Sequence, residues 1–320
     1  MFNQFNTLRS KMTLICILGI SVPFIICMAV YTVFMNKTLK DKVGYELLSN
    51  LVTQSALIDD SFSRVQEGTA KMMMDETLYR IFSKEEFEFT DMEYYMEDKL
   101  VSQALNRYYS NQPDIYASYI ITPDYLFGHM QVYHPLDVLD NSELYKIAAE
   151  NDGKEMWIPT FRYQDMFPEA KCYSDSLNYM PFFAYTRKIQ FISQSDYSLV
   201  PKSGQLPIVL LYFQSNYFDS FFKASEDFSS NIWILADEDV VYSNTGDHDF
   251  PYMNEALALT RGEQGSVMSS DKKNLLTYVS SEITGWKIIS MKSVEDMMSD
   301  TYRLTGMMAV AFVFLLIAVT

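Results

Sequence analysis

The pattern of apolar and polar positions divides the chain into two long apolar runs, one amphipathic helix and a series of short strand-like runs. The first apolar run, from Met12 to Asn36, contains no charged residue. At about 1.5 Å per residue such a helix crosses a hydrocarbon core of roughly 30 Å. The run is longer than the core of a usual signal peptide, about 7 to 15 residues, and no small-residue cleavage site follows it. The pattern therefore favours a membrane anchor over a cleavable leader.

The second apolar run, from Leu304 to Thr320, is also free of charge and has about the minimum length for a span. Because it reaches the last residue without a polar anchor, we expect the chain to be the front part of a longer protein; a short tail anchor is the alternative. Arg9 and Lys11 precede the first span, and the positive-inside rule places that end in the cytoplasm. Residues 36–303 are then extracytoplasmic, and the protein lies in a bacterial cell membrane.

Between the two runs, an amphipathic helix follows the first span. Its apolar residues recur at spacings of three, four and seven, which is the period of a helix with one buried face. They are Leu39, Val43, Leu47, Leu51, Ile58, Phe62 and Val65. The stripe fits either a coiled-coil seam or a face that packs on the domain behind it, and we expect a homodimer through this stalk and the membrane helices.

Short β-rich runs follow from Ile115, separated by turn residues in the manner of antiparallel strands. A second block, from Asn231 onward, repeats the order strand, turn, strand, helix, strands on a smaller scale. Ser293 with an acid three residues later then predicts the N-cap of a helix that enters the second apolar run. The pattern predicts an α+β fold with two antiparallel-sheet subdomains, flanked by two transmembrane helices.

These elements define the expected domain boundaries. They are a cytoplasmic tail at 1–11, a first span at 12–35, a stalk helix at 36–80, a membrane-distal subdomain at 81–214, a membrane-proximal subdomain at 215–292, and a juxtamembrane helix with the second span at 293–320.

Charge and cysteine content exclude some classes of protein. With 25 Lys plus Arg against 41 Asp plus Glu, the net charge of −16 argues against a nucleic-acid partner. Cys16 and Cys27 lie in the first span, so Cys172 is the remaining cysteine and no internal disulfide can form outside, which fits a bacterial protein. The acidic stretch from Lys84 to Lys99 lacks the spacing of a calcium loop and predicts a solvated helical face.

Motifs for catalysis are missing from the sequence. There is no HExxH, GxSxG, phosphate-binding loop or cysteine pair with metal spacing, so we predict no catalytic site, no metal and no cofactor. Residues 247–249, Asp-His-Asp, are flanked by Gly246 and Pro251 and predict a surface turn in preference to a metal site. The three histidines are His129, His134 and His248.

The order of elements resembles the double Cache sensor region of bacterial transmembrane receptors, in which two PAS-like sheets stand on a long membrane-proximal helix. The resemblance is carried by the stalk from Lys37, the strand Ile115 to Ile121, the element Trp157-Ile-Pro159, the strand Phe182 to Ile189, the strand Leu206 to Phe213, and Thr284-Gly-Trp286 with the apolar strand after it. Sensor histidine kinases are the most similar group, although the same sensor occurs on other cytoplasmic outputs. The Arg-x-Trp-Tyr cluster of amino-acid-binding members has no counterpart around Arg187 or Trp157.

Sensors of this type bind small molecules in a pocket over the first sheet, which favours aromatic walls with a few polar groups. The candidate ligand residues are Trp157, Tyr185 and Arg187, with Tyr119 behind them. Tyr185 and Arg187 point to one face of a strand because side chains alternate, and Arg187 would pair with a carboxylate or phosphate. The alternatives are that Trp157 belongs to the core and that Arg187 pairs on the surface with one of the many acids.

These observations predict the ligand-sensing part of a membrane receptor, most simply a two-component sensor histidine kinase. Its partner would be a small molecule or an extracellular or periplasmic binding protein, and ligand binding in the distal subdomain would move the second membrane helix. A membrane-tethered adhesion or scaffold protein is the alternative from another class. A surface hydrolase is a third, for which no nucleophile and base can be named.

Overall fold

The computed structural model describes residues 8–84, 88–109, 115–129, 143–150, 154–162, 181–195, 197–199, 206–222, 230–247, 249–258 and 264–319. His134, Cys172 and His248 lie outside these residues, as does the side chain of His129. The chain forms two compact units, one of residues 52–263 with 279–289 and one of residues 1–51 with 264–278 and 290–320.

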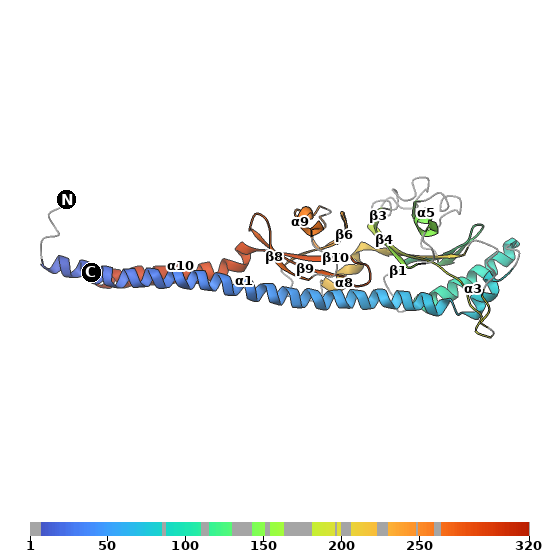
Figure 1. Ribbon diagram of the computed structural model, residues 1–320, viewed down its shortest axis with the longest axis horizontal. Coiled ribbons are helices and arrows are strands. Elements are labelled where there is room, and N and C mark those ends of the chain that lie inside the picture. The colour runs from blue at the N-terminus through green and yellow to red at the C-terminus, as the bar shows by residue number, and fades with distance from the viewer. Residues whose placement is uncertain are drawn as a thin grey trace. The chain divides into compact units, whose positions relative to one another are not determined.

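One uninterrupted helix, α1 (Leu8–Met72), contains both the first apolar run and most of the predicted stalk (Figure 1). It includes Pro23, which a membrane helix tolerates. The helix ends at Met72, earlier than the predicted boundary at 80, because Asp75 starts a new helix, α2 (Glu76–Phe82). The Asp75 carboxylate accepts hydrogen bonds from Thr77 N at 2.8 Å and Leu78 N at 3.1 Å, which satisfies the free amides of the first turn.

Among the described residues, α1 is the one helix whose length and composition suit a membrane span, with a mean hydropathy of 2.3 and no burial in its most apolar window. The second predicted span lies in α10 (Val294–Val319). The rings of Phe24 on α1 and Phe312 on α10 stack at 3.9 Å, so these two helices run side by side. That α10 also spans a membrane stays a prediction.

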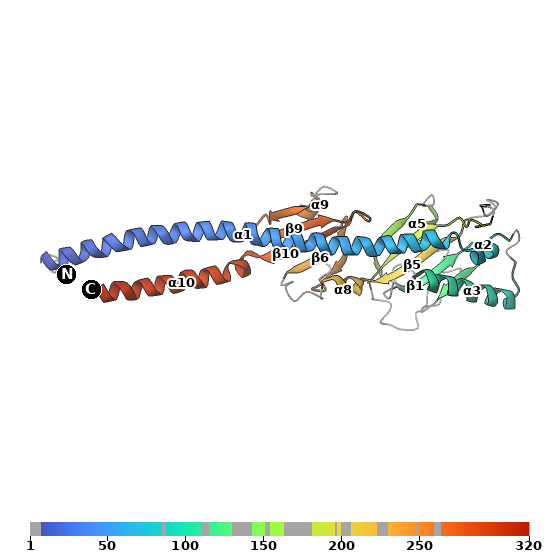
Figure 2. The same ribbon diagram turned by 90° about the horizontal axis from the view of Figure 1, so that it is seen from below.

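The first sheet has five antiparallel strands in the order β2-β1-β5-β4-β3. They are β1 (Ile115–Ile121), β2 (Leu126–His129), β3 (Met156–Arg162), β4 (Pro181–Lys188) and β5 (Ile208–Gln214). Helix α5 (Glu143–Glu150) lies over one face of this sheet and α1 over the other, with α3 (Asp91–Tyr109) against the β1 and β2 end (Figures 1 and 2). A short η2 (Ser215–Phe218) and α8 (Asp219–Phe222) follow β5.

The second sheet repeats the same order, β7-β6-β10-β9-β8. Its elements are β6 (Asn231–Ala236), β7 (Asp239–Ser243), α9 (Met253–Leu257), β8 (Gly265–Met268), β9 (Asn274–Ser280) and β10 (Lys287–Ser293). The predicted turn between β6 and β7 is confirmed, with Asp237 at a φ of 52°. The predicted cap of α10 is confirmed as well, because Ser293 Oγ accepts from Glu295 N at 3.2 Å and Asp296 N at 3.5 Å.

Candidate functional site

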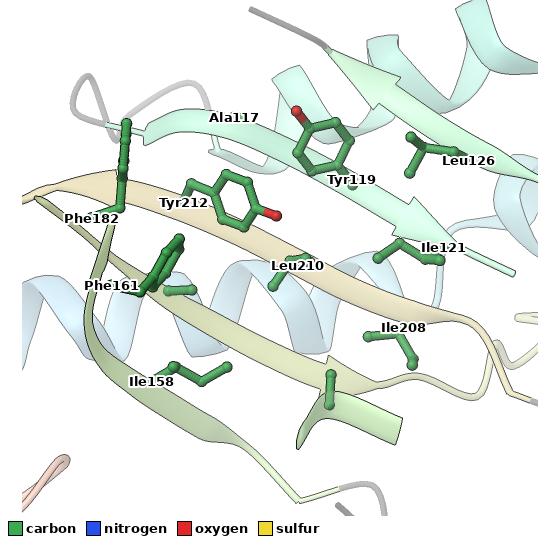
Figure 3. Close-up of a cluster of buried hydrophobic side chains, with 12 residues drawn as sticks. Ala117, Tyr119, Ile121, Leu126, Ile158, Phe161, Phe182, Ile208, Leu210 and Tyr212 are labelled. Atoms are coloured by element: carbon green, nitrogen blue, oxygen red, sulfur yellow. The ribbon is translucent and has the colours of Figure 1, made fainter. Parts of the chain in front are cut away.

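The face of the first sheet that lies away from α1, here called the outer face, carries an aromatic and aliphatic cluster (Figure 3). Its buried members are Ala117, Tyr119, Ile121, Leu126, Ala148, Ile158, Phe161, Phe182, Ala184, Ile208, Leu210 and Tyr212. Ala148 comes from α5, and Tyr145 and Ile147 of the same helix pack against the cluster. The outer face is thus a buried sheet surface, on which α5 packs among the residues that the structure describes.

Two tyrosines give the outer face its polar groups. The rings of Tyr119 on β1 and Tyr212 on β5 meet edge to face with centroids 5.6 Å apart, and Phe161 contacts Tyr212 at 5.7 Å. Figure 3 shows both hydroxyls on this side of the sheet, away from the helix that lies behind it. An aromatic wall with two hydroxyls suits a small, mainly apolar molecule that also forms hydrogen bonds.

The other predicted residues lie on the inner face, which is turned toward α1. Trp157 on β3 is opposite Tyr185 on β4 in the strand register, and their ring centroids are 5.0 Å apart. Trp157 also packs on Phe62 of α1 at 4.1 Å. Arg187 lies on the same face two residues along β4, as the alternation predicts. The register therefore separates these three residues from Tyr119, which pairs with Leu210 and faces outward.

Burial dominates the chemistry of Tyr185. Removal from water raises its pKa to about 12, while Thr69 and Arg187 nearby act in the opposite direction and Glu155 in the same one. No neighbour forms a hydrogen bond of normal geometry with its hydroxyl in the described part of the chain, although Thr69 and Arg187 are close enough to act on its charge. Thr69 Oγ1 instead lies 2.7 Å from Tyr109 Oη. At neutral pH Tyr185 is therefore a neutral, rigidly held ring.

Arg187 is paired within the protein. Its guanidinium donates to the Glu155 carboxylate, and both side chains are partly exposed. This arrangement matches the alternative in which Arg187 pairs with an acid of the chain. The contact of Trp157 with Phe62 likewise matches the core alternative. The ligand roles of Trp157, Tyr185, Arg187 and Tyr119 stay predictions, which the variants below test.

Tyr212, Thr69 and Tyr109 carry no local sequence signal for this site. Every residue of β5 except the last is buried, so its run IVLLYFQ has no alternation to indicate which side faces a pocket. Phe62 belonged to the predicted stripe, and the structure adds that its partner is the first sheet.

Other features that could hold a ligand suit one less well. In the part of the chain that the structure describes, no three His, Cys, Asp or Glu side chains gather as a metal site requires. A hollow of about 380 Å³ lies between α1 and the strands β8 and β9, with Lys40, Tyr45 and Ser266 among its lining residues. It is open to solvent, whereas small-molecule sites enclose most of their ligand.

Two five-stranded antiparallel sheets of identical strand order, following one long N-terminal helix, define a double Cache fold, and the predicted fold is confirmed. No protein-family model matches the chain, and no curated protein is similar to it at a significant level.

Solved structures of similar fold come from sensory proteins. The extracellular domain of vpHK1S-Z8, described as a histidine kinase, has a TM-score of 0.54 at 10% identity, covering 83% of this chain and 96% of that chain. The sensory domain of the Campylobacter jejuni chemoreceptor Tlp3 has a TM-score of 0.51 at 10% identity, covering 82% and 98%. The extracellular domain of soHK1S-Z6, also described as a histidine kinase, has a TM-score of 0.50 at 13% identity. At these identities the likeness shows the fold.

Proposed function

We propose that the chain is the extracytoplasmic ligand-sensing and signal-transmitting part of a bacterial membrane receptor, with a two-component histidine kinase as its output. The observation that carries the proposal is the continuity of α1. One helix contains the candidate membrane span and also packs, through Phe62, on the inner face of a double Cache sheet. A change in that sheet therefore acts on the helix that enters the membrane.

The proposed ligand site is the outer face of the first sheet, with Tyr119 and Tyr212 as its hydrogen-bonding groups. The aromatic wall favours small organic molecules with an apolar part. Solved structures of the sensory domain of Tlp3 contain isoleucine and 4-methylisoleucine, so branched apolar amino acids belong in the first set of compounds to test.

The proposed output element is α10. It begins at Val294, directly after β10, and Val294 N donates to Lys273 O at 2.8 Å. In its first turns Met297 packs with Leu47 of α1 and Leu275 of β9. A ligand shifts this helix only to the extent that it prefers one of two conformations. Two Gly residues inserted after Thr301 should leave ligand affinity unchanged and abolish the ligand-dependent change in kinase activity of the whole receptor. Retained coupling would refute transmission through α10.

The test of sensing is thermal unfolding of the full chain in nanodiscs, monitored by the fluorescence of its three tryptophans. Amino acids, organic acids, sugars and short peptides are added one at a time. A ligand that binds the folded state raises Tm in proportion to the logarithm of its concentration above Kd. A library without any such shift would contradict the proposal and favour the scaffold alternative.

Matched variants locate the site. Tyr119→Phe and Tyr212→Phe each remove one hydroxyl from the outer face, and Tyr185→Phe removes one from the inner face. We expect the first two to weaken ligand binding by roughly fivefold and the third to leave it unchanged, since a hydrogen bond contributes about 1 kcal/mol. Loss of binding in Tyr185→Phe and Arg187→Ala instead would place the ligand among the inner-face residues.

A further inference from the structure

Helix α3 carries an exposed apolar surface that the sheet does not use. Met92, Tyr95 and Met96 are 71%, 65% and 55% exposed. They are three and four residues apart on one side of the first two turns, so they form a single surface, here called the α3 patch. Large exposed apolar groups gathered in one place are typical of interaction surfaces, whereas isolated ones are ordinary.

The opposite side of α3 supports the fold. Val101, Ala104 and Leu105 are buried, and Asp98 Oδ1 accepts a hydrogen bond from Gly128 N of β2 at 2.9 Å. Tyr94 donates from its hydroxyl to Leu126 O. Because these contacts hold α3 on the sheet, Met92, Tyr95 and Met96 are not required for its packing.

The start of α3 is a well-formed capping box, so the patch is presented on a rigid element. Thr90 N and Thr90 Oγ1 donate to Glu93 Oε2 at 2.9 and 2.8 Å, and Glu93 N approaches Thr90 Oγ1 at 3.4 Å. These bonds lower the pKa of Glu93, the backbone bond from Thr90 being the largest cause, so its carboxylate is charged at neutral pH. A rigid surface loses less entropy on binding than a flexible one.

Three exposed acids, Glu88, Asp91 and Glu93, lie at the N-terminal edge of the patch, and exposed Lys99 lies one turn beyond it on the same side of α3. A partner with an apolar centre and Lys or Arg around it would complement both features. A second copy packed in parallel would place these acids opposite the same acids, and an anionic lipid surface would be repelled by them. The chain's net charge of −16 adds attraction for a basic partner over longer distances.

We propose that the α3 patch binds an extracytoplasmic protein through an apolar surface with a basic rim. Methionine and tyrosine suit this role because both are enriched at protein interfaces and adapt to the shape of a partner. The binding surface lies on a different element from Tyr119 and Tyr212, so it adds a protein input to the proposed small-molecule site.

The experiment uses the full chain in bacterial membranes with p-benzoylphenylalanine in place of Tyr95. Irradiation should crosslink one extracytoplasmic protein, identified by mass spectrometry and then purified. Its Kd for the full chain in nanodiscs should be at least tenfold higher in the double variant Met92→Glu, Met96→Glu. The Kd for the wild type should also rise as the NaCl concentration is increased. The matched control is Gln103→Glu, Asn106→Glu, which adds the same charge to the same side of α3 beyond the patch and should change Kd less than twofold.

Several results would overturn the proposal: crosslinks only to a second copy or to lipid, no adduct, or a purified partner that binds the Met92→Glu, Met96→Glu variant as tightly as the wild type. An unchanged Tm in that variant checks that it folds. The shift in Tm that a small molecule causes depends on the outer face and not on the α3 patch. If the α3 patch binds no partner, that shift is still expected, so the two proposals can fail independently.

Discussion

Two stretches of the same helix are buried in different ways. Around Phe62, α1 meets aromatic rings: Trp157 at 4.1 Å, Trp286 at 6.0 Å and Phe183 at 6.2 Å. Around Leu47, α1 meets a smaller aliphatic cluster of Leu275 and Met297. Interlocked rings resist sliding, whereas a small aliphatic contact that includes a flexible methionine rearranges at low cost. The difference suits a helix that is held firmly near the first sheet and is free to adjust nearer to the candidate span.

The largest expected effect comes from truncating Phe62 and Leu47, one at a time. Phe62→Ala should lower the free energy of unfolding by about 3 to 5 kcal/mol, because it leaves a cavity among rings that cannot collapse. Leu47→Ala should cost roughly 2 kcal/mol, since its smaller and less crowded cluster can close around the gap. Tryptophan-detected denaturation of the full chain in detergent measures both. Equal losses would contradict the contrast between the two stretches.

A glycine within β2 of the first sheet and a glycine just after β7 of the second sharpen the comparison. Gly128 in β2 has a φ of 137°, and a Cβ there would lie 2.3 Å from Ser118 O, so Gly128→Ala should destabilise by about 2 to 3 kcal/mol. Gly246, which follows β7, has a φ of 79° with open space around it, so Gly246→Ala should cost about 1 kcal/mol through backbone strain alone. Thermal unfolding of both variants measures these two losses of stability. A greater loss in Gly246→Ala than in Gly128→Ala would contradict the prediction.

The next prediction concerns the turn that leads into β10. Asp59 on α1 accepts from Ser281 Oγ at 2.5 Å and Glu282 N at 3.0 Å, and Trp286 follows within the same turn. Asp59→Asn should weaken this attachment by about 1 to 2 kcal/mol and speed hydrogen exchange at the amides of residues 281–286. The neighbouring Asp60 pairs on the surface with Arg64, so Asp60→Asn is the matched control and should change exchange little. Equal exchange in both variants would mean that Asp59 does not hold the turn.

The smallest effect is the pH dependence of Asp98. Burial raises its pKa above the ordinary 3.8, and the bond from Gly128 N offsets only part of that shift. The folded state therefore holds the proton more tightly than the unfolded state, and stability from this group falls as pH rises through the interval above 3.8. Asp98→Asn keeps an acceptor for Gly128 N and cannot ionise. The Tm of Asp98→Asn should increase relative to that of the wild type as pH rises across that interval. If Tm depends on pH in the same way in both proteins, the raised pKa of Asp98 is contradicted.

Local sequence patterns were sufficient for most elements. The predicted strand Ile115 to Ile121 matches β1, and β4, β5 and β10 lie within one or two residues of expectation. The repeat of element order also appeared in the sequence, and the structure gives it as identical strand order in the two sheets. The end of the stalk at Met72 and the length of α3 were not predicted. Asp75 caps α2 through Thr77 N and Leu78 N while Arg107 and Tyr108 of α3 hold the other oxygen of its carboxylate, and the buried residues of α3 lie only in its second half, after its acids.

The sequence by itself determined the apolar helix, the stalk periodicity, the strands and the absence of a recognisable catalytic motif, since each of these depends on residues close together in the chain. It also placed Tyr185 and Arg187 on one side of a strand, because alternation is local. Only the tertiary structure decided that this side faces α1 while Tyr119 and Tyr212 face outward. Which faces of two different strands coincide depends on their register, and a shift of one residue would exchange them. In β4 and β5 both faces are buried, so hydrophobicity could not make that choice and the packing of α1 and α5 did.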